Sequence, residues 1–202
     1  MKLRYSPTSP YVRKTVIAAI ECGLRDQIEI VETNPWSPDT DLGEDNPLGK
    51  VPALITEDGM VLFDSPVICE YLDSLGAAAT LFPPAGAGRW SALRAQALGD
   101  GILDAAVLRL LESRRPEAQQ SADWAARQKR AIERSLDALE TDRAALDGPV
   151  TIGQIAVGAA LGYLDFRFAA DDWRATRPGL AAWYEGFSQR PSMQETVPVD
   201  PA

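Results

Sequence analysis

Apolar and polar positions alternate differently in the first third of the chain and in the rest. The short stretch Lys2–Tyr5 predicts a strand, and apolar residues then recur at helical spacing up to Gly23, a typical residue just past a helix end. Ile28–Val31 is β-branched and short, which predicts a second strand. The segment from there to Lys50 is rich in Pro, Asp and Asn, so we expect an irregular loop.

A hairpin and a helix follow this loop. In "VPALITEDGMVLF" two apolar runs flank Asp58-Gly59, a dipeptide typical of a hairpin turn. Ser65 then begins a segment with apolar residues at helical spacing, which stops at Gly76. The predicted order is β-α-β-loop-β-β-α, and we expect it to form one domain over residues 1–77.

The remainder of the chain predicts helices only. Residues 78–88 are rich in small residues and contain two prolines, which favours an interdomain linker, and residues 89–202 are then expected to form an all-helical domain. Thr151 and Gln154 have the spacing of a capping box at a helix start. The four helical segments that we expect are Trp90 to Arg114, Trp124 to Leu146, Thr151 to Phe166, and Pro178 to Arg190.

Length and composition indicate a globular protein. With 202 residues and 46% hydrophobic content the chain can bury a substantial core. No apolar run is long enough to span a bilayer and the first residues lack a secretory h-region, so we expect a cytoplasmic protein. Cys22 and Cys69 lie in helical patterns without C-x-x-C spacing, so we expect buried thiols, no disulfide and no metal site.

Charge and the missing histidine narrow the possible activities. A net charge of −9 disfavours nucleic acid and anionic lipid as partners. The chain contains no histidine, which excludes Ser-His-Asp and Cys-His triads. Any catalysis must therefore use positioned dipoles, carboxylates or a nucleophile that ionises by itself.

Three short segments at the boundaries of the predicted elements, which we call joints, resemble segments of a known family. They are "SPYVRK" at the first helix, "NPLGKVPAL" before the hairpin and "DSPVICEYL" at the last helix of the first domain. In this order they resemble the soluble glutathione transferase family, and "DGILDAAVLRLLESRRPE" is similar to the first long helix of a bacterial branch. The resemblance implies an α/β thioredoxin-like glutathione-binding domain followed by an all-α helical domain, glutathione as co-substrate, a small electrophile bound against the helical domain, and a homodimer.

The first joint has a structural and a chemical interpretation. Ser9 suits the N-cap and Pro10 the first helical position, which explains both residues without any chemistry. A helix N-terminus also stabilises a thiolate, and a hydroxyl donor adds to this effect. Given the resemblance, Ser9 is expected to hold the glutathione sulfur ionised. Thr8 and Ser6 are alternatives, because a shift of one residue at a turn changes which hydroxyl faces the ligand.

The other two joints are expected to bind the rest of glutathione. A proline ahead of a strand is ordinarily trans, but the resemblance implies a cis Val51-Pro52 bond that turns the Val51 backbone toward the cysteinyl peptide. Lys50 is then placed to reach the glycyl carboxylate, although a solvated lysine explains it as well. Ser65 starts a helix whose free N–H groups suit the γ-glutamyl carboxylate, and Asp64, where many relatives carry Glu, suits its ammonium.

The electrophile pocket and the degree of turnover stay open. Candidates on the first long helix are Leu108, Leu111, Glu112 and Arg115, which core packing or solvation explains equally well. The favoured function is a glutathione transferase that activates the thiol for attack on a small electrophile or peroxide. The alternative is a non-catalytic module with the same fold that uses the helical domain for docking. A glutathione-disulfide oxidoreductase is disfavoured because it needs cysteine where Ser9 stands.

Overall fold

The first domain is built on a four-stranded mixed sheet. The computed structural model describes residues 1–76, 78 and 80–200. Its strands are β1 (Lys2–Tyr5), β2 (Glu29–Glu32), β3 (Ala53–Ile55) and β4 (Val61–Leu62). The order in the sheet is β2-β1-β3-β4, with β1 parallel to β2 and antiparallel to β3, and β3 antiparallel to β4. The predicted α/β thioredoxin-like domain is confirmed.

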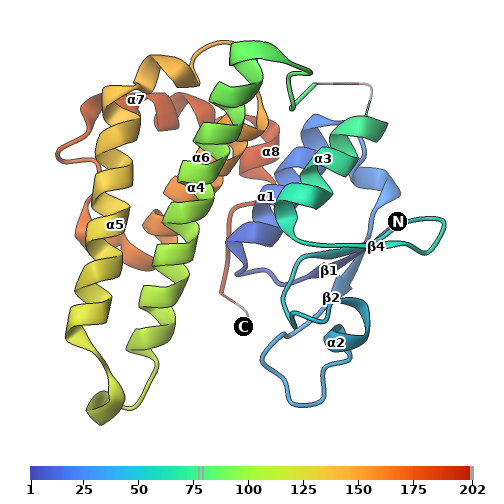
Figure 1. Cartoon of the computed structure of the whole chain (residues 1–202), viewed down its shortest axis with the longest axis horizontal. Helices are drawn as coiled ribbons and strands as arrows, with labels where there is room; N and C mark the ends of the chain where they lie inside the picture. The colour runs from blue at the N-terminus through green and yellow to red at the C-terminus, as the bar shows by residue number, and fades with distance from the viewer. Residues whose placement is uncertain (77, 79, 201–202) are drawn as a thin grey trace.

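Helices cover both sides of this sheet. Helices α1 (Pro10–Glu21) and α3 (Ser65–Leu75) pack against each other on one side, and the short α2 (Leu42–Asp45) lies on the other (Figure 1). The expectation of a wholly irregular loop between β2 and β3 is therefore wrong. Leu42 is fully buried, so one turn of helix forms there around an apolar anchor within a polar segment.

Strand directions bring the three joints to one end of the sheet. Arg4 at the end of β1 pairs with Ala53 at the start of β3. Leu54 pairs with Leu62, so β4 also ends where β3 begins. The loops that leave β1, enter β3 and leave β4 thus lie at the same edge, and both α1 and α3 begin there.

The second domain is helical, as predicted. Its helices are α4 (Gly86–Ser113), α5 (Ala122–Thr141), α6 (Ile152–Phe168), α7 (Pro178–Phe187) and α8 (Pro191–Gln194). Helix α6 is buried along most of its length between α4 and α1. Gly99 of α4 allows this close packing, because a β-carbon there would lie 2.6 Å from the backbone carbon of Ala156.

Several helix boundaries differ from the prediction. Helix α4 begins at Gly86, four residues before Trp90 and inside the segment 78–88 that we expect to be a linker. The sequence does not predict this start, because the small residues there carry no recognisable N-cap. The domain boundary at residue 77 and position 79 of the linker lie outside the described residues. The second long helix ends at Thr141, and Leu146 belongs to a separate 3₁₀ turn, η3 (Arg143–Leu146).

The last predicted helix is also shorter than expected. Helix α7 ends at Phe187 rather than Arg190, and Pro191 begins α8. Further short 3₁₀ turns are η1 (Arg25–Gln27), η2 (Glu117–Gln119) and η4 (Ala169–Asp171). By contrast, the capping box at α6 is confirmed: the Thr151 N–H donates to the Gln154 side chain at 2.9 Å, and the Thr151 hydroxyl accepts from the Gly153 N–H at 3.2 Å.

The two cysteines are unpaired and buried. Burial raises the pKa of Cys22 to about 12 and that of Cys69 to about 11, so both stay protonated at neutral pH. No helix among the described residues is long and apolar enough to cross a membrane. Nor do residues 1–76, 78 and 80–200 bring together three or more metal-ligating side chains.

Candidate functional site

Ser9 caps the helix that follows β1. A tight turn places it there, since the Ser9 N–H donates to the Ser6 carbonyl at 3.1 Å. Its Oγ accepts from the Val12 N–H at 3.3 Å, and Pro10 occupies the first helical position. A hydroxyl that accepts a helical N–H still has its own proton to donate. The capping role and a donor role for Ser9 are therefore compatible.

A cavity of about 440 Å³ borders this turn. It contacts Ser6 and Ser9 and continues along α1 toward the C-terminal segment. The other lining residues are Tyr5, Pro7, Arg13, Val16, Ile20, Arg25, Ile30, Glu195, Thr196 and Val197. Thr8 is partly exposed in the same turn without lining the cavity. None of the four electrophile candidates, three on α4 and Arg115 just beyond its end, lines it either.

The loop before β3 is held by Asn46. This residue is almost fully buried; its side-chain amide donates to the Lys50 carbonyl at 2.7 Å, and its side-chain oxygen accepts from the Leu48 N–H at 3.0 Å. The Val51–Pro52 peptide bond is cis, as the resemblance implied. Val51 is buried and Lys50 is exposed. Sequence reasoning missed Asn46, although "NP" marks a turn at this point.

The start of α3 presents an exposed carboxylate beside a buried hydroxyl. Asp64 is the N-cap residue by position, but its side chain makes no capping hydrogen bond and faces solvent. Ser65 is only 2% exposed. The Asp64 carbonyl accepts from the Ile68 N–H at 3.1 Å, whereas the N–H groups of the first turn have no helical acceptor. This end of the helix is suited to an anion.

Two polar side-chain contacts join α1 to α4. Lys14 is fully buried and donates to Asp100 at 2.6 Å, and the Tyr11 hydroxyl donates to Asp104 at 2.5 Å. Burial raises the pKa of Asp100, with the charges of Asp104 and Asp64 adding to the effect and Lys14 opposing it. Burial also raises the pKa of Tyr11, so its hydroxyl keeps the proton that it donates.

The charged electrophile candidates have structural partners. Glu112 is buried and accepts from the Ser121 N–H at 2.6 Å, while Arg115 donates to the same carboxylate at 3.4 Å. The interpretation of Glu112 as a solvated side chain is therefore wrong, because it holds the connection between α4 and α5. Leu108 is 42% exposed on α4, and Leu111 is partly buried.

Comparison with known proteins identifies the family. The model "Glutathione S-transferase, N-terminal domain" matches residues 8–75, and "Glutathione S-transferase, C-terminal domain" matches residues 122–186. The chain belongs to the glutathione S-transferase family. It is 40% identical to the uncharacterized GST-like protein YibF of Escherichia coli (strain K12), over 98% of both chains.

Solved glutathione transferases share the whole architecture. A glutathione transferase family member from Pseudomonas fluorescens Pf-5, with bound glutathione, is 42% identical with a TM-score of 0.93, over 98% of this chain and 99% of that chain. A glutathione S-transferase from Methylobacillus flagellatus KT, with glutathione bound, is 38% identical with the same TM-score and the same coverage. The predicted family and its two-domain fold are confirmed.

Proposed function

We propose that this protein is a glutathione transferase in which the Ser9 hydroxyl holds the glutathione sulfur as a thiolate for attack on a small electrophile or a peroxide. The observation that carries the proposal is the position of Ser9: its hydroxyl caps α1 at the edge of the sheet where the cis Val51–Pro52 bond and the start of α3 also lie. Two relatives of the same architecture bind glutathione.

Thiol ionisation is the chemical task at Ser9. A free thiol titrates near pH 8.5, so about 3% is ionised at pH 7, and a depression of roughly two units makes thiolate the major form. A hydrogen bond to a charged group contributes on the order of 1.5–3 kcal/mol, or about one to two pKa units. The positive end of α1 adds to this stabilisation. No histidine is needed.

The loop before β3 supports the proposed binding of the cysteinyl peptide. In the described part of the chain, no hydrogen bond engages the N–H or C=O of Val51. Buried backbone groups ordinarily find partners, so this residue suits an extended peptide ligand. The exposed Lys50 ammonium beside it is suited to the glycyl carboxylate.

The start of α3 supports binding of the γ-glutamyl end. The unpaired N–H groups of the first turn and the Ser65 hydroxyl favour its carboxylate. The Asp64 carboxylate is exposed and makes no capping bond, so it is free to pair with the ammonium. Both ends of the tripeptide then have a partner of opposite charge.

Assays of the purified protein with glutathione and a panel of electrophiles and peroxides test this function. We expect turnover of at least one class that depends on glutathione. If the protein binds glutathione but turns over no substrate of a broad panel, the result would instead favour a non-catalytic binding module with the same fold.

Alanine at Ser65 or at Asp64 should weaken glutathione binding, because each change removes one contact to the γ-glutamyl end. A lost hydrogen bond to a charged group corresponds to roughly tenfold in the dissociation constant. Titration calorimetry measures this. Ser74→Ala, at the other end of α3, is the matched control and should bind normally. If both test variants bind glutathione with unchanged affinity, Asp64 and Ser65 serve only to start helix α3.

The protein is expected to be a homodimer. Large apolar side chains are exposed on the β4 hairpin, on α3 and at the start of α4; they are Met60, Val67, Leu75 and Trp90. Large exposed apolar side chains such as these are candidates for protein contacts. Light scattering at micromolar concentration should give about twice the 21.9 kDa chain mass. A monomer mass across that range would contradict the expectation.

A further inference from the structure

The segment that follows α8 passes between the two domains with few polar contacts. Thr196 is still firmly held, because its hydroxyl donates to the Ser192 carbonyl at 2.7 Å and accepts from Nε of Arg13 at 3.4 Å. Within the described residues, none of the next three positions takes part in a hydrogen bond. We call residues 197–200 the strap.

An ion pair holds the far end of the strap. The Asp200 carboxylate lies 2.8 Å from Nη1 of Arg167, which belongs to the last turn of α6. The Arg167 guanidinium stacks on the Phe166 ring at 3.8 Å, and its side chain is 13% exposed, whereas that of Asp200 is 63% exposed. Arg167 has no second carboxylate partner in the described part of the chain. The pair thus joins a fixed cation to a segment with few other contacts.

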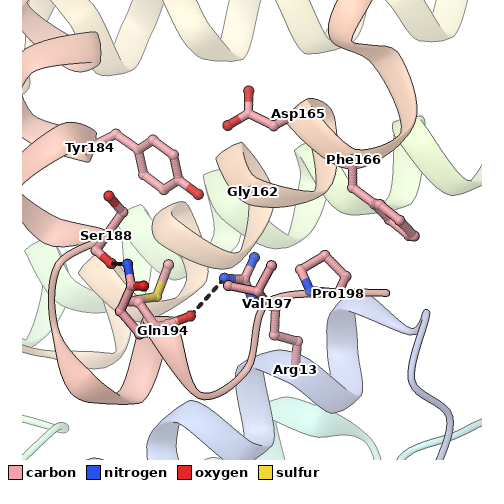
Figure 2. Close-up of a pocket in the computed structure, with 10 residues that line it drawn as sticks. Arg13, Gly162, Asp165, Phe166, Tyr184, Ser188, Gln194, Val197 and Pro198 are labelled. Carbon is pink, nitrogen blue, oxygen red and sulfur yellow. Dashed lines mark hydrogen bonds between the residues drawn. The ribbon is translucent and has the colours of Figure 1, made fainter. Parts of the chain in front are cut away.

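The strap lies between two cavities (Figure 2). Val197 lines both the cavity of about 440 Å³ that borders Ser9 and a second cavity of about 280 Å³. Gly162 and Phe166 of α6 also line the second cavity. Figure 2 shows Val197 and Pro198 crossing between α1 and α6. Displacement of the strap therefore joins the two cavities into one cleft that begins at Ser9.

The strap is held only weakly in this position. Val197 is 56% exposed and Val199 is 62% exposed, so about half of each side chain gains nothing from burial. An ion pair with an exposed partner shifts an equilibrium by about fivefold or less. A ligand that binds only the open form can supply this difference.

The joined cleft has largely apolar walls. Val16, Ile20 and Ile30 line the larger cavity, and Phe166 and Met193 line the smaller one. Sites for drug-sized ligands typically measure about 300–1,000 Å³, so each cavity alone is small on this scale. The two together are suited to a ligand with a larger apolar body than either holds alone.

We propose that the strap is a specificity-determining gate for the electrophile and that the Arg167–Asp200 ion pair is its latch. With the latch closed, the cavity beside Ser9 admits small electrophiles only. When the ion pair opens, the strap leaves the space between α1 and α6, and a bulkier apolar electrophile reaches the thiolate. The nature of the ligand rests on the proposed function, but the latch itself does not.

Binding of the neutral fluorescent probe N-phenyl-1-naphthylamine to the whole protein, without glutathione, tests the latch. The apparent affinity of a ligand that binds only the open form scales with the fraction of open protein. Asp200→Asn should therefore bind the probe about two- to fivefold more tightly than wild type at low ionic strength. High sodium chloride should narrow this difference, because it screens the ion pair. Equal affinities at low ionic strength would overturn the proposal.

Two further variants assign the effect to this ion pair. In an Arg167→Met background, Asp200→Asn should change probe binding no further, since the latch is already broken. Asp147→Asn breaks the exposed Arg143–Asp147 pair with the same change in net charge, so it is the matched control and should bind as wild type. If Asp147→Asn raises the affinity as much as Asp200→Asn does, the cause is net charge and the latch is refuted.

NMR order parameters of the valine methyl groups measure the strap without any ligand. The values for Val197 and Val199 should fall in Asp200→Asn, because the freed strap moves on the fast timescale that these parameters report. They should stay as in wild type in Asp147→Asn. Unchanged values in Asp200→Asn would contradict release of the strap.

Turnover with glutathione tests the role in specificity. In Asp200→Asn, kcat/KM should rise for an electrophile with a bulky apolar group and stay unchanged for a small one with the same reactive group. An equal change for both electrophiles would contradict the gate. If no electrophile is turned over, the proposed function fails, whereas the probe and the methyl measurements still decide whether the latch exists.

Discussion

Replacing Ser9 by alanine should lower the rate of glutathione conjugation at neutral pH by about tenfold or more. The change removes the hydroxyl donor proposed for the sulfur, which corresponds to about one to two pKa units of thiolate stabilisation. The rate should recover in part as pH rises, because the bound thiol then ionises unaided. Since the Val12 N–H also loses its cap, the free energy of unfolding should fall by roughly 0.5–2 kcal/mol. A pH–rate profile and a denaturant titration measure the two effects separately.

Neighbouring hydroxyls provide the controls for Ser9. Thr8→Ala and Ser6→Ala remove hydroxyls from the same turn and should leave the pH–rate profile unchanged. Ser9→Cys keeps a polar group at the N-cap and should exchange transferase activity for glutathione-disulfide exchange, because a thiol at a helix N-terminus ionises readily. A Ser9→Ala profile that overlays wild type would contradict the assignment and favour Thr8, then Ser6.

Elements with local signals were predictable from the sequence. Strand β1, the helix start at Ser9-Pro10, the Asp58-Gly59 hairpin and the Thr151–Gln154 capping box all depend on residues a few positions apart. Helix α2 was missed because it forms around one buried leucine within a segment of turn-forming residues. The sequence predicts the start of α4 four residues too late, because the glycine and alanine residues there carry no capping signal.

The candidate site likewise combines residues that local sequence signals predict with residues that only the fold brings together. Each of the three joints carries a local motif of its own, and strand pairing explains why the three lie at one edge. Lys14 with Asp100, and Arg13 with Gly162, are contacts between residues far apart in the chain. In the sequence Arg13 and Lys14 resemble ordinary charged positions of an amphipathic helix, so neither predicted burial against the second domain.

Replacing Lys14 by methionine should cost about 3–5 kcal/mol of the free energy of unfolding near pH 8. Lys14 is fully buried, and its ammonium donates to Asp100 at 2.6 Å. Methionine has a similar shape but leaves a largely buried carboxylate without its cation, which is far more costly than the loss of an exposed pair. Lys129→Met, which breaks the more exposed contact to Asp171, is the control and should cost about 1 kcal/mol or less.

The pH dependence distinguishes this unpaired charge from a simple packing defect. Burial already raises the pKa of Asp100 above its ordinary value, so protonation of Asp100 favours the folded state as pH falls, and that contribution is lost as pH rises through the folded pKa. Without the Lys14 ammonium the pKa of Asp100 should rise further. Denaturant titrations of Lys14→Met should therefore show a smaller loss near pH 5 than near pH 8. Asp100→Leu added to Lys14→Met should restore part of the stability, because neither charge is then left buried alone. A loss that is the same at both pH values and in the double variant would instead indicate packing alone.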